Sequence, residues 1–141
     1  RTDVVFVKED VDYDQRVAAF VEVGWLENPG DPRSTPWPVH TIDTVRSPHS
    51  LDVADLDGDG RLEIVVGEHD PFRPYRSRSR LLAYKQADPR GHGWYRYTLD
   101  DRFEHHDGVR IFETTPGRMA IASHGWAEPL YVHLWEFPNE D

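Results

Sequence analysis

The stretch His49–Asp70, HSLDVADLDGDGRLEIVVGEHD, decides the fold of this chain. Its centre is an acidic loop, residues 55–63, in which two glycines allow the positive φ angles of a tight turn. Carboxylates stand at loop positions 1, 3, 5 and 9, on Asp55, Asp57, Asp59 and Glu63. Oxygens at these positions, with the backbone carbonyl of Arg61 at position 7, can wrap one hard cation. The loop is therefore predicted to bind Ca²⁺, and an acidic turn without metal is the alternative.

Apolar runs flank the acidic loop on both sides, from Leu51 to Ala54 and from Leu62 to Val66. No amphipathic helical pattern precedes the loop, and Val66 stands at loop position 12, where an EF-hand needs a glutamate. The unit is therefore predicted to be strand, loop, strand.

The composition excludes several classes of protein. The chain of 141 residues can form one domain with a core, and its net charge of -10 argues against general nucleic-acid binding. No apolar run reaches membrane-spanning length, so no membrane partner is expected. The absence of cysteine excludes disulfides and thiolate metal sites. Because a calcium loop fills more readily outside the cell, the expected localisation is extracellular or periplasmic.

A repeat with an offset of 57 residues runs through the chain. Shifting the sequence by this offset superposes Asp31-Pro32-Arg33 on Asp88-Pro89-Arg90, and His49 on His106. The same shift matches Trp37 with Trp94, Thr41 with Thr98, Asp43 with Asp100, Gly60 with Gly117, Arg61 with Arg118 and Ile64 with Ile121. In addition, residues 1–5 align with residues 61–65, so the chain is expected to begin directly after a lost acidic loop.

Each repeat unit has room for four strands. The complete unit is expected to have strands near 50–55, 62–68, 80–86 and 94–99. The flanking units are expected to have strands at 4–8, 18–26 and 38–43, and at 108–113, 118–124 and 131–137. Residues 1–46 are thus predicted as a partial blade, residues 47–103 as a complete blade, and residues 104–141 as a terminal blade without its outer strand.

Four-stranded antiparallel units at this period are typical of a β-propeller. The predicted fold class is all-β, a propeller segment of about two and a half blades. Such a segment cannot close a ring and leaves apolar faces bare, so we expect it to belong to a larger, seven-bladed propeller or to an oligomeric assembly. A small β-sandwich is the alternative.

The loop and the strand after it, Asp55-Leu-Asp-Gly-Asp-Gly-Arg-Leu-Glu-Ile-Val-Val-Gly67, resemble the FG-GAP/VCBS-type repeat of calcium-loop β-propellers. Residues 24–29 and 131–135 resemble the third strand of such blades. The resemblance implies calcium ligands at Asp55, Asp57, Asp59, Glu63 and the carbonyl of Arg61. The third blade departs from the pattern in residues 112–117, where a Pro-Gly turn is expected in place of the ion.

Blade topology predicts where the remaining polar residues gather. The acidic loop joins one end of the first two strands of a blade, so residues at their other ends lie at the opposite mouth of the propeller. The residues expected at this mouth are His49, His69, Asp70, His105, His106, Asp107, His124, Trp126 and Glu128, with the arginine-rich segment 71–80 beside them.

These mouth residues support a hypothesis about chemistry. His49, His106 and Tyr75 are predicted to transfer protons. Arg73, Arg76 and Arg78 are predicted to bind an anionic group, and Trp126 to stack on a sugar ring. His69 and His124 are candidate ligands of a second ion, Zn²⁺ or another divalent metal. For each histidine taken alone, a purely structural role is the alternative.

The resemblance leaves more than one function open, because the family includes adhesion modules, lectin-like domains and polysaccharide or sugar lyases. The mouth is similar in kind to that of lyase and dehydratase propellers of the ulvan lyase and aldos-2-ulose dehydratase type. We therefore expect a carbohydrate-active propeller that works by β-elimination. The alternatives are a non-catalytic glycan-binding module and a pure scaffold. The expected partners are carbohydrate and the remaining blades or further copies of the chain.

Overall fold

The structure is a computed structural model that describes residues 2–72, 79–125 and 131–137. Within these ranges the chain forms twelve strands and no helix. The first sheet contains β1 (Val4–Val7), β4 (Phe20–Leu26) and β5 (Val39–Arg46). The second contains β6 (Pro48–Ala54), β7 (Glu63–Glu68), β8 (Leu81–Gln86) and β9 (Trp94–Asp100). The third contains β10 (Asp107–Thr115), β11 (Arg118–His124) and β12 (Val132–Glu136).

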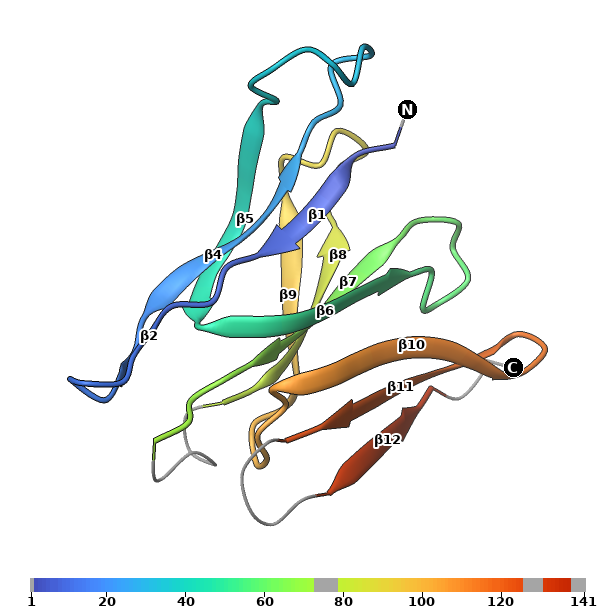
Figure 1. The fold of residues 1–141 in the computed structure, drawn as a ribbon. Helices are drawn as coiled ribbons and strands as arrows, with labels where there is room; N and C mark the ends of the chain where they lie inside the picture. The colour runs from blue at the N-terminus through green and yellow to red at the C-terminus, as the bar shows by residue number, and fades with distance from the viewer. Residues whose placement is uncertain (1, 73–78, 126–130, 138–141) are drawn as a thin grey trace.

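Each sheet is an antiparallel meander in which consecutive strands are neighbours, apart from the excursion between β1 and β4. That excursion is a short hairpin of β2 (Val11–Asp12) and β3 (Val17–Ala18), which the sequence did not predict. The three sheets lie side by side, as neighbouring blades of a propeller do (Figure 1). The predicted all-β fold and its arrangement as a partial propeller are confirmed. Every predicted strand has a counterpart, although β5 continues to Arg46, past its predicted end.

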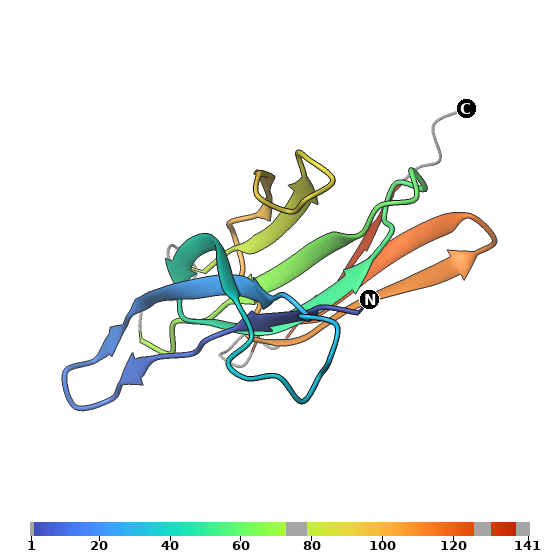
Figure 2. The same cartoon turned by 90° about the horizontal axis from the view of Figure 1, so that it is seen from above.

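Two apolar clusters hold the three sheets together, one on each face of the middle sheet. Because side chains alternate along a strand, neighbouring residues of β7 face opposite ways. Ile64 and Val66 pack with Val23 and Val45 of the first sheet. Val65 packs on the other face with residues of the third sheet, namely Val109 and Ile121. Strands β7 and β8 are thus buried on both faces, whereas the outer strand β9 is largely exposed. The middle sheet lies between the other two (Figure 2).

Polar contacts across the sheets fix their relative positions. The hydroxyl of Tyr84 in the middle sheet donates a hydrogen bond of 3.0 Å to Asp43 of the first. Asp52 of the middle sheet accepts a hydrogen bond of 2.7 Å from the backbone N–H of Ile111 in the third. These contacts join the interior of β8 to β5 and the interior of β6 to β10, and so hold neighbouring sheets together.

Gly67 marks the closest approach of the middle sheet to the segment that precedes β10. A Cβ atom at this position would lie 1.9 Å from the carbonyl oxygen of His105 and 2.8 Å from Oγ of Ser50. The backbone of residues 104–106 can run over β7 only because residue 67 has no side chain. This contact positions Glu104 and His106, two residues of the candidate site described below.

Candidate functional site

The acidic loop 55–63 is the hairpin turn between β6 and β7. The carboxylate of Asp55 accepts hydrogen bonds from the N–H groups of Gly58 (2.8 Å) and Gly60 (2.9 Å). Both glycines adopt positive φ angles, 74° and 85°. The N–H of Arg61 donates to Asp59 at 2.9 Å, while a role for its carbonyl oxygen in binding calcium stays a prediction. The loop thus curls around its own carboxylates in the way that a cation site requires.

Three of the predicted calcium ligands converge. One carboxylate oxygen each from Asp55, Asp57 and Glu63 lies within 4.8 Å of the other two. Glu63 is only 5% exposed, and within the described residues its buried Oε1 accepts no hydrogen bond. Burial raises the pKa of Glu63, which a nearby cation would reverse. The donor set therefore fits Ca²⁺, which takes carboxylate oxygens as ligands. Asp59 lies outside this group and pairs with Lys85 at 2.8 Å.

Calcium at about ten times its dissociation constant is expected to stabilise the fold by about 1.4 kcal/mol, because it binds only the folded loop. Substituting Glu63→Gln should abolish most of this gain, measured by urea unfolding with and without calcium. The matched control is Glu113→Gln in the corresponding turn of the third sheet, where Oε1 accepts the N–H of Gly117 at 2.6 Å. If the Glu63→Gln protein gains as much from calcium as the wild type, this loop is not the calcium site.

A second cluster, here called the histidine centre, consists of His49, His69, His106, Glu9 and Glu104. The ring of His106 lies between the other two, 3.6 Å from the ring of His69 and 4.0 Å from that of His49 by their centroids. Thus two residues that the repeat superposes, His49 and His106, meet in space. Their meeting is what the blade topology predicted for the mouth.

Carboxylates surround the three imidazoles of the histidine centre. Glu104 Oε1 lies 3.3 Å from Nδ1 of His69, and Glu9 Oε2 lies 3.1 Å from Nδ1 of His49. The other oxygen of Glu9 lies 3.9 Å from Nε2 of both His69 and His106. Next to the centre, the carboxylate of Asp107 lies 3.2 Å from Nδ1 of His106.

The centre is assembled from all three sheets. Glu9 follows β1, His49 lies at the start of β6, and His69 follows β7. Glu104 and His106 precede β10. Figure 1 shows these strand ends on one side of the molecule, and the hairpin between β6 and β7 on the other. The histidine centre and the acidic loop therefore lie at opposite ends of the middle sheet.

Donor atoms in this centre form two overlapping groups in which all members lie within 4.8 Å of one another. One group is His69, Glu104 and His106, and the other is Glu9, His49 and His106. His69 and Glu104 are buried, whereas His49 and Glu9 are exposed. Imidazole nitrogens combined with carboxylate oxygens are the donor set of Zn²⁺ and similar divalent ions.

Not every residue predicted at the mouth joins the histidine centre. His124 belongs to neither donor group found in the described residues: its ring covers Gly108, and its Nδ1 lies 3.2 Å from the carbonyl oxygen of Gly125. The geometry therefore pairs His69 with His106 and Glu104, where the sequence paired it with His124. The remaining residues lie outside the described ranges, and these are Arg73, Tyr75, Arg76, Arg78, Trp126 and Glu128.

His105 faces away from the histidine centre into the protein. Its Nδ1 lies 2.8 Å from Oγ of Ser123, its Nε2 lies 3.1 Å from Asp100, and the residue is fully buried. A serine, a histidine and an aspartate are thus linked as in some hydrolases, but no substrate can reach them. Burial lowers the pKa of His105, which keeps the ring neutral. This network joins the second and third sheets and is structural.

Acid is expected to destabilise the metal-free protein before its carboxylates titrate. Burial, with His69 and His49 nearby, lowers the pKa of His106 from 6.5 to about 4. Between these values the unfolded chain takes up a proton that the folded protein does not, so stability falls as the pH drops through this window. Urea unfolding in EDTA at several pH values should give a shallower slope for His106→Gln. An unchanged slope would show that His106 titrates normally in the folded protein.

Residues 1–66 match the family model of the FG-GAP-like repeat. The matched part covers the first sheet, β6, the acidic loop and the beginning of β7. It supports the resemblance to the FG-GAP repeat family. A search of curated proteins found no match. Among the described residues, no helix is long and apolar enough to cross a membrane.

The sequence did not predict two acidic members of the histidine centre. Glu9 lies within the part that matches the FG-GAP-like repeat, and Glu104 lies beyond it. Glu9 comes from the excursion that carries β2 and β3, and nothing in the repeat predicts this excursion. Glu104, however, stands two residues before a histidine already predicted at the mouth. Alternation along the chain could therefore have placed it beside His106, with His105 facing the other way.

Proposed function

We propose that this protein is a carbohydrate-active β-propeller whose histidine centre binds a divalent metal ion and transfers a proton in β-elimination. The observation that supports this most directly is the group of His69, Glu104 and His106, three donors within 4.8 Å of one another at the meeting point of two sheets. Two imidazoles and a carboxylate that converge in this way offer the mixed nitrogen and oxygen donors that a Zn²⁺ ion or similar cation takes as ligands.

The protonation state of His106 favours metal binding. A metal ligand and a general base both need a neutral imidazole. The lowered pKa of His106 keeps that ring neutral near pH 7. When bound, the ion would act as a Lewis acid towards a carbonyl or carboxylate oxygen of the substrate.

His49 is the residue best suited to abstract the proton. Its side chain is 37% exposed, so a substrate can reach it, and Glu9 at 3.1 Å orients its ring. In the proposed step, a ring nitrogen of His49 takes the proton from the carbon next to the carbonyl or carboxylate. The electron pair of that C–H bond forms a C=C bond as the C–O bond at the adjacent carbon breaks. The leaving oxygen then takes up a proton from the imidazolium of His49, which returns to its neutral form, so that atoms and charges balance.

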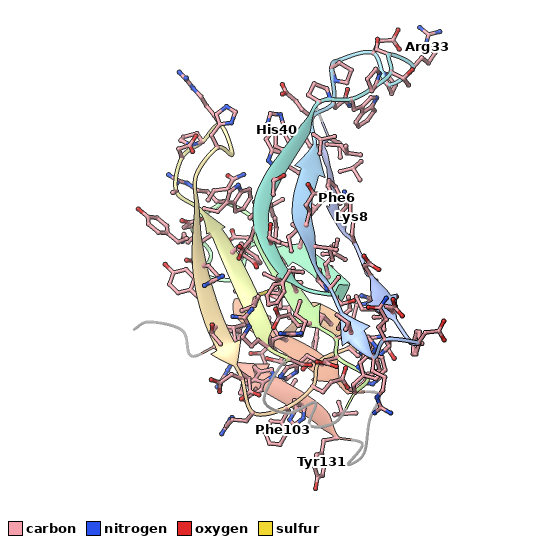
Figure 3. The ribbon with its side chains drawn as sticks, turned by 90° about the vertical axis from the view of Figure 1, so that its left-hand side faces the viewer. Phe6, Lys8, Arg33, His40, Phe103 and Tyr131 are labelled. Atoms are coloured by element: carbon pink, nitrogen blue, oxygen red, sulfur yellow. The ribbon has the colours of Figure 1, made fainter. Side chains whose placement is uncertain are left out.

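Aromatic side chains near the centre offer a surface for a sugar ring. Phe103 directly precedes Glu104, and its ring lies 4.4 Å from that of His133 and 6.3 Å from that of Tyr131 by their centroids. Figure 3 shows Phe103 and Tyr131 at one end of the molecule, with Arg33 at the other. Tyr131 is 51% exposed, and exposed aromatic faces stack on sugar rings. Our sequence-based proposals for Tyr75, Arg73, Arg76, Arg78 and Trp126 would add to this surface.

The test is to incubate the protein with uronate polymers and with keto-sugars, each with and without added Zn²⁺, and to follow ultraviolet absorbance of the new C=C bond. We expect unsaturated product that depends on the ion. Binding of glycan without new unsaturation would indicate a lectin or adhesion module instead. Neither binding nor product across the panel would leave the propeller as a scaffold. A secreted or periplasmic location is part of the proposal.

A further inference from the structure

We propose that Lys85 competes with calcium for the acidic loop and thereby sets the loop's calcium affinity. This inference rests on the predicted calcium site in residues 55–63. It concerns a residue outside the loop, on the next strand but one of the same sheet.

Strand pairing brings Lys85 to the loop. The pairing of β7 with β8 ends at Ile64 and Tyr84, so Lys85 lies one residue further, beside Glu63 at the loop's end. Leu81 and Ala83, which share its face of β8, are buried against the third sheet. At Lys85 this face leaves the core. It borders an open cavity of about 1340 Å³, which the acidic loop also lines. The apolar stem can therefore run along the blade while the ammonium reaches the carboxylates.

The ammonium contacts carboxylates that a cation in the loop would need as ligands. Lys85 Nζ pairs with Oδ2 of Asp57, lies 2.8 Å from Oδ2 of Asp59 and lies 4.0 Å from Oε1 of Glu63. All three carboxylates are predicted calcium ligands. These contacts raise the pKa of Lys85 and lower that of Asp59, so both groups stay charged.

A calcium ion and the ammonium of Lys85 cannot bind the same carboxylate oxygens at the same time. Calcium needs six to eight oxygens at 2.3–2.6 Å, while an ammonium has only three donors to offer the same oxygens. Two positive charges a few ångströms apart also repel each other. Calcium binding must therefore displace the ammonium, and breaking its contacts weakens the apparent calcium affinity. In exchange, Lys85 limits repulsion among the carboxylates when calcium is absent.

The test is calcium titration by calorimetry on the wild type and on Lys85→Met, which keeps the stem and removes the charge. We expect calcium affinity to rise about tenfold, within the usual range for coupling between two ligands. The same variant should unfold at a lower temperature than the wild type in EDTA, because its loop carboxylates have lost their counter-ion. This second readout does not depend on calcium.

The matched control is Lys8→Met, which changes the net charge equally but removes a lysine that pairs with Glu22 in the first sheet. It should leave calcium affinity almost unchanged. An equal rise in both variants would overturn the proposal, since the effect would then be general electrostatics. Weaker calcium binding in Lys85→Met would also overturn it, because Lys85 would then support the loaded loop. If neither the wild type nor Lys85→Met binds calcium, the prediction of a calcium site is wrong, and so is the proposal that Lys85 competes for it.

Discussion

Replacing His106 by glutamine is expected to slow the proposed elimination about 10²- to 10³-fold, because it removes a ligand of the proposed ion and with it electrostatic stabilisation of the transition state. His106 is the one imidazole that belongs to both donor groups, so its loss disrupts the pair with His69 and the pair with His49 together. Glutamine fills a similar space but offers no ring nitrogen to a metal ion or a proton. Initial rates, measured by absorbance of the unsaturated product at saturating substrate and metal, test this expectation.

His124→Gln is the matched control for that experiment. His124 was also predicted at the mouth, but its Nδ1 faces the carbonyl of Gly125, and it is no member of either donor group in the described residues. The control should retain most of its activity. Urea unfolding of both variants separates a chemical defect from misfolding. Equal activity losses in the two variants would contradict the assignment of His106 to the centre.

Substituting Gly67→Ala is expected to cost about 2–3 kcal/mol of folding free energy, at the upper end of what overpacking costs. The new Cβ would lie 1.9 Å from the carbonyl oxygen of His105, a backbone atom that cannot rotate away. The segment 104–106 must therefore move, and with it Glu104 and His106. Chemical denaturation measures the loss of stability, and zinc titration of the folded variant measures the disturbance of the centre.

Gly93→Ala provides the comparison, because the nearest atoms to its new Cβ are side-chain atoms, Asp88 Oδ2 at 3.2 Å and Ala87 Cβ at 3.3 Å. Asp88 can adjust, so this variant should lose much less stability than Gly67→Ala. The account of residues 104–106 would be wrong if the two variants were equally stable, or if Gly67→Ala bound zinc as tightly as the wild type.

The sequence predicted the sheets well because local signals and the repeat agree there. The apolar runs on both sides of loop 55–63 became β6 and β7, and the repeat placed the strands of the first and third sheets. The hairpin of β2 and β3 was missed for a physical reason. Its strands have two residues each, too few for an alternating pattern to stand out from a loop.

The candidate site was only partly predictable, because topology places strand ends but does not orient side chains. His49 and His106 were expected together and do meet. His124 lies near the same end of its blade, but its ring folds over Gly108, which has a positive φ of 68° and no side chain to exclude it. Glu9 reaches the centre from a loop whose course only tertiary packing determines. Lys85 was overlooked for the same reason, since its role depends on the pairing of β7 with β8.

The most direct test of the central claim, that imidazoles and carboxylates from separate blades form one metal centre, is a zinc titration by calorimetry of the protein and its variants. Our proposal predicts tight binding of one zinc ion per chain, which His106→Gln abolishes and which His124→Gln and Glu63→Gln leave intact. The claim would be contradicted if no zinc bound, or if binding survived in His106→Gln and was lost in His124→Gln or Glu63→Gln.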